Sequence, residues 1–230
     1  MDVILVPGLW LDASSWDDVL PVLAAAGHTP HALTMPGVGA AAAESAEITI
    51  ADWIDAVVTE LDALESPAVL VGHSGGGNVV WGAADARPEK VARVVFVDTI
   101  PPHPGGQVSE FPIVDGVIPF PGWDFFDDED VHDLDAATRE RTAPSMKSVP
   151  ARVPTDPVPL ADPRRFDLPV TLLMGGMDEP TFRRAVAQWG PHGDEFGAIA
   201  DAEVIRLGTA HWPQFTKPAE LGAAIVGAVR

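Results

Sequence analysis

The chain has 230 residues, of which 47% are hydrophobic, and a formal net charge of −20 at pH 7. A surface this acidic repels phosphate backbones and anionic lipids, which argues against nucleic acid and membranes as partners. The chain contains no cysteine, which excludes disulfides and thiolate sites. No apolar run approaches the ~20 residues that span a bilayer. We therefore expect one α/β domain, and because a strand rather than a signal-peptide pattern opens the chain, a cytoplasmic location.

Six short apolar runs have the character of β-strands, and most are nearly continuous Val, Ile and Leu. In chain order they are residues 3–6, 31–35, 68–71, 94–97, 170–174 and 204–207. Such runs are typical of parallel strands buried on both faces. Helical segments separate them, so the sequence predicts a mostly parallel, doubly wound sheet with right-handed crossovers and strand order 2-1-3-4-5-6.

Capping signals mark several of the predicted helices. Ser14 and Ser15 precede an acidic first turn, and Gly27 ends that segment. Thr49 followed by Asp52 resembles a capping box, with apolar residues at helical spacing behind it. A last helix is expected over residues 218–229.

The stretch from residue 100 to about 165 breaks the alternation of strands and helices. It is rich in proline and aspartate, and it is too long for a structureless loop in a compact domain. We expect a small cap insertion here, with one helical piece at residues 135–141. The spacing of its acidic residues does not fit a calcium-binding EF-hand loop, so they are interpreted as a solvated face.

The most informative motif is Gly72-His73-Ser74-Gly75-Gly76, which matches the G-x-S-x-G nucleophile elbow. A β-branched strand precedes it and a helix-compatible segment follows. In this geometry the serine occupies a strained turn at the carboxyl end of the sheet. The flanking glycines are expected where strand and helix pass too closely for a Cβ.

With this elbow in place, the chain resembles the α/β-hydrolase family over nearly its whole length. The segment Val6-Pro7-Gly8-Leu9-Trp10, with Ser15-Trp16 beyond it, is similar to the oxyanion loop of the esterase/hydroxynitrile-lyase group. That group usually carries His where Pro7 stands. The resemblance implies an α/β-hydrolase fold with a small cap and a catalytic serine, acid and histidine.

The family's chain order of serine, acid and histidine predicts the catalytic residues Ser74, Asp178 and His211. Asp178 follows the fifth predicted strand and His211 follows the sixth, on the sheet edge that carries Ser74. Asp98 ends the fourth strand at the same edge and is the alternative acid. Strand position and the resemblance favour Asp178.

The loops after the first and third strands should face each other at the topological switch point of the sheet. The backbone amides of Leu9 and Gly75 are therefore expected to form an oxyanion hole. Trp10 and Trp212 flank the predicted catalytic loops, and with Trp123 from the cap they are expected to bind substrate.

The remaining histidines suggest no further site. His73 is interpreted as structural packing beside the elbow, and His28 and His31 lack neighbours at metal-ligand spacing. No metal or cofactor is expected.

The function that these residues favour is hydrolysis of a carboxylic ester or lactone, a small-molecule substrate, through an acyl-enzyme on Ser74. Three alternatives remain open. Cyanohydrin cleavage is disfavoured because Trp212 stands where the lyases carry Lys after the histidine. Carbon–carbon bond hydrolysis is suggested by a faint likeness of residues 211–215 to meta-cleavage product hydrolases. The third alternative is a non-catalytic protein that only binds a small molecule.

Overall fold

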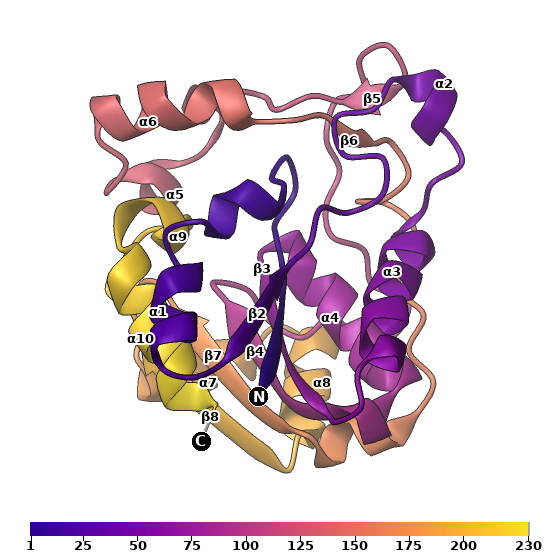
Figure 1. The fold of residues 1–230 in the computed structure, drawn as a ribbon, viewed down its shortest axis with the longest axis vertical. Helices are drawn as coiled ribbons and strands as arrows, with labels where there is room; N and C mark the ends of the chain where they lie inside the picture. Colours follow the sequence, from indigo (N-terminus) through magenta and orange to yellow (C-terminus); the bar gives the residue numbers. More distant parts are fainter. Residues whose placement is uncertain (230) are drawn as a thin grey trace.

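The computed structural model describes residues 1–229, and a six-stranded parallel sheet lies at its centre (Figure 1). The strands of this sheet are β1 (Asp2–Val6), β2 (Thr29–Ala32), β3 (Ala68–His73), β4 (Val91–Val97), β7 (Pro169–Met174) and β8 (Asp201–Arg206). Their spatial order is β2-β1-β3-β4-β7-β8, with every neighbouring pair parallel. All six predicted strands are present, and the predicted order is confirmed.

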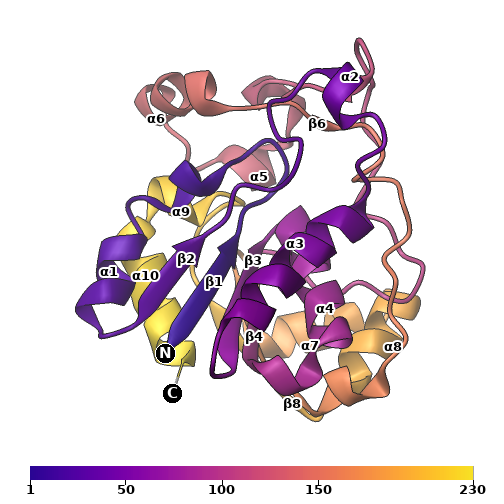
Figure 2. The same ribbon diagram turned by 45° about the vertical axis from the view of Figure 1, so that its right-hand side comes forward.

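The sheet is buried on both faces because its strands are apolar at nearly every position. Side chains alternate between two cores: Ile4, Val6, Leu70 and Phe96 belong to one, and Val3, Leu5, Val71 and Val97 to the other. Helices cover each face. Residues of α3, α4, α7 and α8 pack into the first core and residues of α10 into the second, where α1 lies alongside α10 (Figure 2).

The helices are α1 (Leu20–Ala25), α2 (Ala42–Ser45), α3 (Ile50–Ala63), α4 (Gly75–Ala86), α5 (Asp128–Val131), α6 (Ala136–Thr142), α7 (Glu179–Val186), α8 (Pro191–Ala198), α9 (Pro213–Thr216) and α10 (Pro218–Ala228). The predicted capping box is confirmed, since Thr49 and Asp52 bond each other's backbone amides at the start of α3. The first predicted helix is split into a short 3-10 turn, Ala13–Trp16, and α1, which has Pro21 in its first turn.

The chain between β4 and β7 leaves the sheet and crosses the end of the molecule towards which β1 runs (Figures 1 and 2). It contains α5, α6 and a small antiparallel pair, β5 (Val117–Ile118) and β6 (Val149–Pro150). We call this segment the cap. Helix α6 lies where residues 135–141 predict a helical piece, and Asp135 caps it by accepting from the amide of Thr138.

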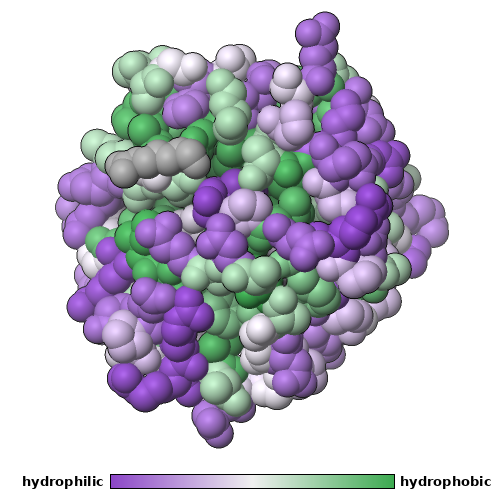
Figure 3. Space-filling view, turned by 90° about the horizontal axis from the view of Figure 1, so that it is seen from below, coloured by the Kyte–Doolittle hydropathy of each residue, from purple (hydrophilic) through white to green (hydrophobic). Residues whose placement is uncertain are grey.

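The opposite end of the molecule, where β1 begins, is seen from below in Figure 3. Hydrophilic and hydrophobic side chains are interspersed on this face. Within residues 1–229, none of the helices combines the length and apolar character that crossing a membrane requires.

Candidate active site

Ser74 occupies a strained turn between β3 and α4, as the elbow motif predicts. Its backbone angles are φ 52° and ψ −125°, a region that residues other than glycine rarely enter. A Cβ on Gly72 would lie 2.5 Å from the carbonyl oxygen of Gly76, and a Cβ on Gly76 would lie 2.6 Å from that of Pro7. Both contacts are with backbone that has no room to move. The two glycines therefore permit the close passage that presents Ser74 at the sheet edge.

His211 lies in the loop after β8, and its carboxylate partner is Asp98, at the end of β4. The Nδ1 atom of His211 is 2.7 Å from Oδ2 of Asp98. The backbone amide of Gly175, after β7, donates to the other carboxylate oxygen at 2.7 Å. Asp98 has φ 46°, a left-handed conformation that Asp tolerates better than most residues. That turn brings its carboxylate to the histidine.

The prediction that Asp178 orients the histidine is therefore wrong. Asp178 is exposed and serves as the N-cap of α7, where its carboxylate accepts from the backbone amide of Thr181 at 2.9 Å. Hydrogen bonds with Thr181 lower the pKa of Asp178; the bond with its side chain has the largest effect, and the bond with its backbone amide follows. Its carboxylate satisfies the amides of its own helix start, and Asp98, the alternative acid, takes the place beside His211.

The pair of Asp98 and His211 has a defined protonation pattern. Burial acts to raise the pKa of Asp98, but the hydrogen bond and charge of His211, with the amide of Gly175, bring that pKa below its usual value. The ionised carboxylate accepts a hydrogen bond, so the imidazole proton resides on Nδ1. The Nε2 atom of His211 then carries a lone pair and is able to accept a proton.

Ser74 and His211 line the same cavity, which has a volume of about 310 Å³. Among residues 1–229, no hydrogen bond joins Ser74 Oγ to His211 directly. Such contacts are often long in unliganded enzymes and tighten when substrate binds. The structure thus places the alcohol and the imidazole at one cavity, with the carboxylate on the far side of the imidazole.

The loops that carry Leu9 and Gly75 lie against each other beside this cavity. A Cβ on Gly75 would be 3.2 Å from Cγ of Leu9. In the described part of the chain, the Leu9 amide donates to no acceptor, and the Gly75 amide belongs to the first turn of α4, which has no intrahelical partner. Both amides are therefore free for a ligand atom, as the oxyanion-hole prediction requires.

Two of the three tryptophans predicted to bind substrate line the cavity, namely Trp10 and Trp212. The prediction for Trp123 is not supported. Trp123 is buried in the cap, packs edge-on against Trp212 at 5.0 Å between ring centroids, and donates its indole N–H to the carbonyl of Arg139. It supports the wall of the cavity from behind.

Several residues that line the cavity were not predicted from the sequence: Asn78, Thr99, Val108, Ser109, Phe111, Phe125, Phe126 and Asp130. Most belong to the cap, whose acidic residues were interpreted as a solvated face. The run Asp124-Phe125-Phe126-Asp127 was the available signal, because two adjacent aromatic residues in a polar segment indicate a surface that something covers.

His73 is a buried structural residue, as predicted, and it bonds to the loop that carries His211. Its Nε2 lies 2.7 Å from the carbonyl oxygen of His211, which can only accept. Burial first, and then the charge of His211, lower the pKa of His73 to about 3. The ring is therefore neutral with its proton on Nε2, and Nδ1 accepts from the amide nitrogen of Gln214 at 3.3 Å.

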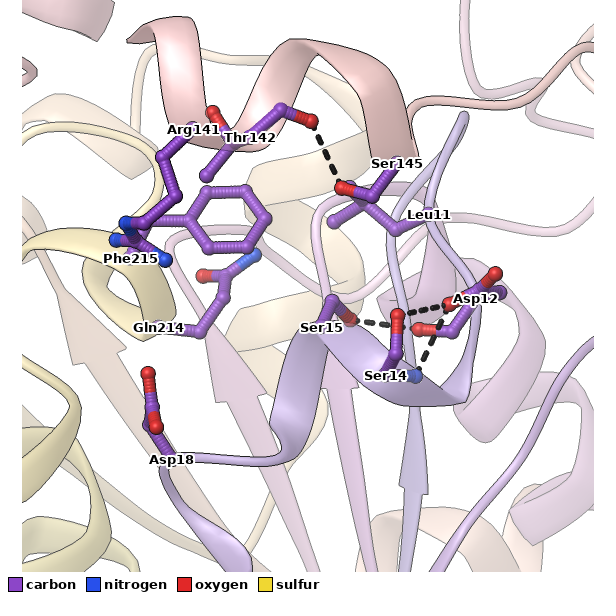
Figure 4. A pocket seen from close by; sticks show the side chains of 10 residues that line it. All are labelled: Leu11, Asp12, Ser14, Ser15, Asp18, Arg141, Thr142, Ser145, Gln214 and Phe215. Carbon is purple, nitrogen blue, oxygen red and sulfur yellow. Dashed lines mark hydrogen bonds between the residues drawn. The ribbon is translucent and has the colours of Figure 1, made fainter. Parts of the chain in front are cut away.

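The same Gln214 also lines a second, smaller cavity of about 90 Å³, shown in Figure 4. The view places Gln214, Phe215 and Arg141 on one side and Ser14 and Ser15 on the other. Neither Ser74 nor His211 lines this cavity, so it is separate from the candidate active site. The described residues also contain no group of three or more His, Asp or Glu side chains placed to hold a metal ion.

Comparisons with known proteins agree with this fold. The sequence profile of the Alpha/beta hydrolase family matches residues 3–224. Esterase PIR7B of Oryza sativa subsp. japonica is 39% identical over 116 residues, which cover 47% of this chain and 43% of that protein. The carbendazim hydrolyzing esterase of a Nocardioides species is 36% identical over 107 residues, which cover 46% of this chain and 44% of that protein. The matched region thus spans less than half the length of these relatives.

Solved structures share the fold over nearly the whole chain. An extracellular alpha/beta-hydrolase from a Paenibacillus species has a TM-score of 0.78 and 21% identity, covering 99% of this chain and 98% of its own. A pyrethroid hydrolase from Sphingobium faniae JZ-2 has a TM-score of 0.71 and 20% identity, and the match covers 100% of this chain and 97% of that one. With a family profile that matches almost from end to end, this chain belongs to the alpha/beta hydrolase family.

Proposed function

We propose that the chain is a serine esterase that cleaves a carboxylic ester or lactone through an acyl-enzyme on Ser74. The observation that carries the proposal is the bond between His211 Nδ1 and Asp98 at 2.7 Å, beside a cavity that Ser74 also lines. An imidazole held in this tautomer is the base that a serine hydroxyl needs in order to attack a carbonyl. The esterase names of the curated relatives support the same activity.

In the proposed reaction, Nε2 of His211 takes the hydroxyl proton as Ser74 Oγ forms a bond to the ester carbonyl carbon. Asp98 stabilises the resulting imidazolium, and the amides of Leu9 and Gly75 donate to the oxyanion. Collapse of the tetrahedral intermediate breaks the bond to the alcohol, which leaves with the proton from His211. Water then repeats the sequence on the acyl-enzyme, with His211 as base, and releases the carboxylic acid.

The lining of the cavity favours ester hydrolysis over cyanohydrin cleavage. Cyanide leaves as an anion and is stabilised by a cation near the histidine. The residue after His211 is the buried Trp212, and none of the Lys and Arg residues within positions 1–229 lines the cavity. The volume of about 310 Å³ is near the lower end of the ~300–1,000 Å³ usual for ligand pockets, so we expect a compact or aromatic substrate.

A panel of p-nitrophenyl esters of increasing acyl length, assayed beside small lactones, tests the proposal. The wild-type enzyme should release p-nitrophenol with an initial burst equal to the enzyme concentration, and Ser74→Ala should lose turnover by about 10⁶-fold. An Ser74→Ala protein that keeps its turnover within a few-fold of wild type would contradict the proposal.

A further inference from the structure

One carboxylate borders the catalytic cavity and has no partner in it. Asp130 belongs to the cap helix α5, is half-buried, and lines the cavity together with Ser74 and His211. Its backbone carbonyl accepts from the amide of His211 at 3.1 Å, which fixes α5 against the histidine loop. Within residues 1–229, its carboxylate makes no hydrogen bond and no ion pair. This oxygen pair is therefore available to a bound substrate.

The electrostatics of the cavity favour a cation at this place. Among residues 1–229, Asp130 is the only Asp or Glu in the lining of the cavity, and no Lys or Arg lines it. His73 is neutral, and the charge of His211, the other histidine in the lining, acts to lower the pKa of Asp130. The chain as a whole carries a charge of −20, which attracts cations and repels anions at long range. Burial, the largest cause, raises the pKa of Asp130, so the carboxylate has given up part of its solvation. A bound cation would offset that loss.

Aromatic rings surround the same space. Phe126 lies 4.7 Å from Trp212, 5.3 Å from Phe125 and 5.8 Å from Trp10 between ring centroids. Phe111 extends this wall, with its centroid 4.8 Å from Trp10. The faces of such rings attract alkylammonium groups, and the attraction is strongest where water is excluded. A carboxylate beside an aromatic wall is the combination that an organic cation requires.

We propose that Asp130 and this aromatic wall select esters that carry an alkylammonium group over neutral or anionic esters of the same shape. The inference rests on the proposed esterase function and names its substrate class. An alkylammonium group next to α5 would pair with Asp130 and contact the rings, while its ester carbonyl lies at Ser74. An anionic ester of equal size would meet an uncompensated carboxylate in the same place.

The test compares two esters that differ only in charge: a choline ester and its 3,3-dimethylbutyl isostere, in which carbon replaces the quaternary nitrogen. The readout is the ratio of kcat/KM for the cationic ester to that for the neutral one. Wild-type enzyme should favour the cationic ester by at least about tenfold, and Asp130→Asn should lower the ratio by about tenfold. Asp130→Lys should reverse the charge preference, so that an anionic hemisuccinate ester is hydrolysed with a higher kcat/KM than the choline ester.

Asp127→Asn is the matched control, because it removes the same charge one helical turn earlier from an exposed residue that does not line the cavity. Its ratio should stay within about twofold of wild type. An equal fall in Asp127→Asn and Asp130→Asn would mean that only the overall field acts, and would overturn the inference. A wild-type ratio near one would also overturn it.

Binding of both esters to the Ser74→Ala protein, followed by tryptophan fluorescence, gives the same comparison without turnover. Tighter binding of the choline ester, lost in the double variant with Asp130→Asn, supports the inference even if the chain hydrolyses neither ester. Equal binding of the two esters overturns the inference. Ser74-dependent turnover of p-nitrophenyl esters with equal binding would leave the proposed esterase intact, so the two failures are distinguishable.

Discussion

Replacing Asp98 with Asn tests whether Asp98 or Asp178 is the carboxylate that orients His211. Asn retains the size of Asp and tolerates the left-handed backbone at φ 46°. Its carbonyl oxygen can still accept from the amide of Gly175, which now donates to Oδ1 of Asp98 at 2.7 Å. Its amide group then faces Nδ1 of His211 and can only donate. The imidazole must therefore carry its proton on Nε2, the atom that has to accept the serine proton.

The size of the effect follows from this change of tautomer. The corresponding Asp-to-Asn change in a serine protease triad lowers kcat by about 10⁴-fold, the magnitude we expect for Asp98→Asn. This corresponds to about 5 kcal/mol of lost transition-state stabilisation, at about 1.4 kcal/mol for each factor of ten. The assay is steady-state hydrolysis of a p-nitrophenyl ester at pH 7.5, with circular dichroism to show that the variant is folded.

Asp178→Asn is the matched control, since Asn caps a helix about as well as Asp. Its carboxylate bonds only to the start of α7, so activity should stay within about twofold of wild type and stability within about 0.5 kcal/mol. The reasoning is refuted if Asp98→Asn keeps activity within about tenfold of wild type while Asp178→Asn loses a factor of 10³ or more.

Two further predictions concern stability, each measured as the free energy of unfolding in urea. Gly76→Ala should cost about 2 kcal/mol or more because its Cβ would meet the carbonyl oxygens of Val6 and Pro7 at 2.6 Å. Gly227→Ala in α10 meets nothing within 4 Å and should be neutral or slightly stabilising, and equal losses would contradict this. The second prediction concerns pH. Because burial lowers the pKa of His73 from 6.5 to about 3, the unfolded chain binds a proton at this residue below pH 6.5, whereas the folded chain does not. The free energy of unfolding should therefore fall as pH drops from 6.5 towards 3, and this group should account for about 2 kcal/mol of the fall at pH 5. In His73→Gln this contribution should be absent, so stability should fall less steeply. In the control His132→Gln, which changes an exposed histidine, the fall should equal that of wild type. Identical declines in all three proteins would contradict the assignment.

The sheet and the strained turn at Ser74 were predictable because their signals are local. An unbroken apolar run such as 68–71 can be stable only as a strand covered on both faces, and six such runs with helices between them fix a parallel sheet. Gly72 and Gly76 restrict the turn at Ser74 by sterics that depend only on adjacent backbone. Strand order then places the loops of Leu9 and Gly75 together.

The carboxylate partner of His211 was harder to predict because two aspartates follow neighbouring strands at the same edge. Which one reaches His211 depends on a single backbone turn at Asp98, and no residue pattern specifies it. A local signal against Asp178 was nevertheless present. An Asp followed by Glu179 and Pro180 is a typical helix start, and such a carboxylate is committed to its own helix.

The cap was the least predictable part, because long-range contacts define it. Asp130 and Phe126 come to the cavity only when α5 packs against the histidine loop, through the bond from the His211 amide to the Asp130 carbonyl. Trp123, only three residues from Phe126, does not line the cavity although it packs against the same Trp212. Short irregular segments of this kind have no periodicity from which a facing direction can be deduced.

The central claim is that Ser74 is a nucleophile activated by His211 and Asp98, and labelling with a fluorophosphonate probe followed by peptide mass spectrometry tests it most directly. We expect one phosphonylated residue, Ser74, in the wild-type and Asp178→Asn proteins. In His211→Ala and Asp98→Asn, labelling should be slower by at least 10²-fold. An active wild-type enzyme that remains unlabelled at Ser74, or labelling of Ser74 that is equally fast without His211, would contradict it.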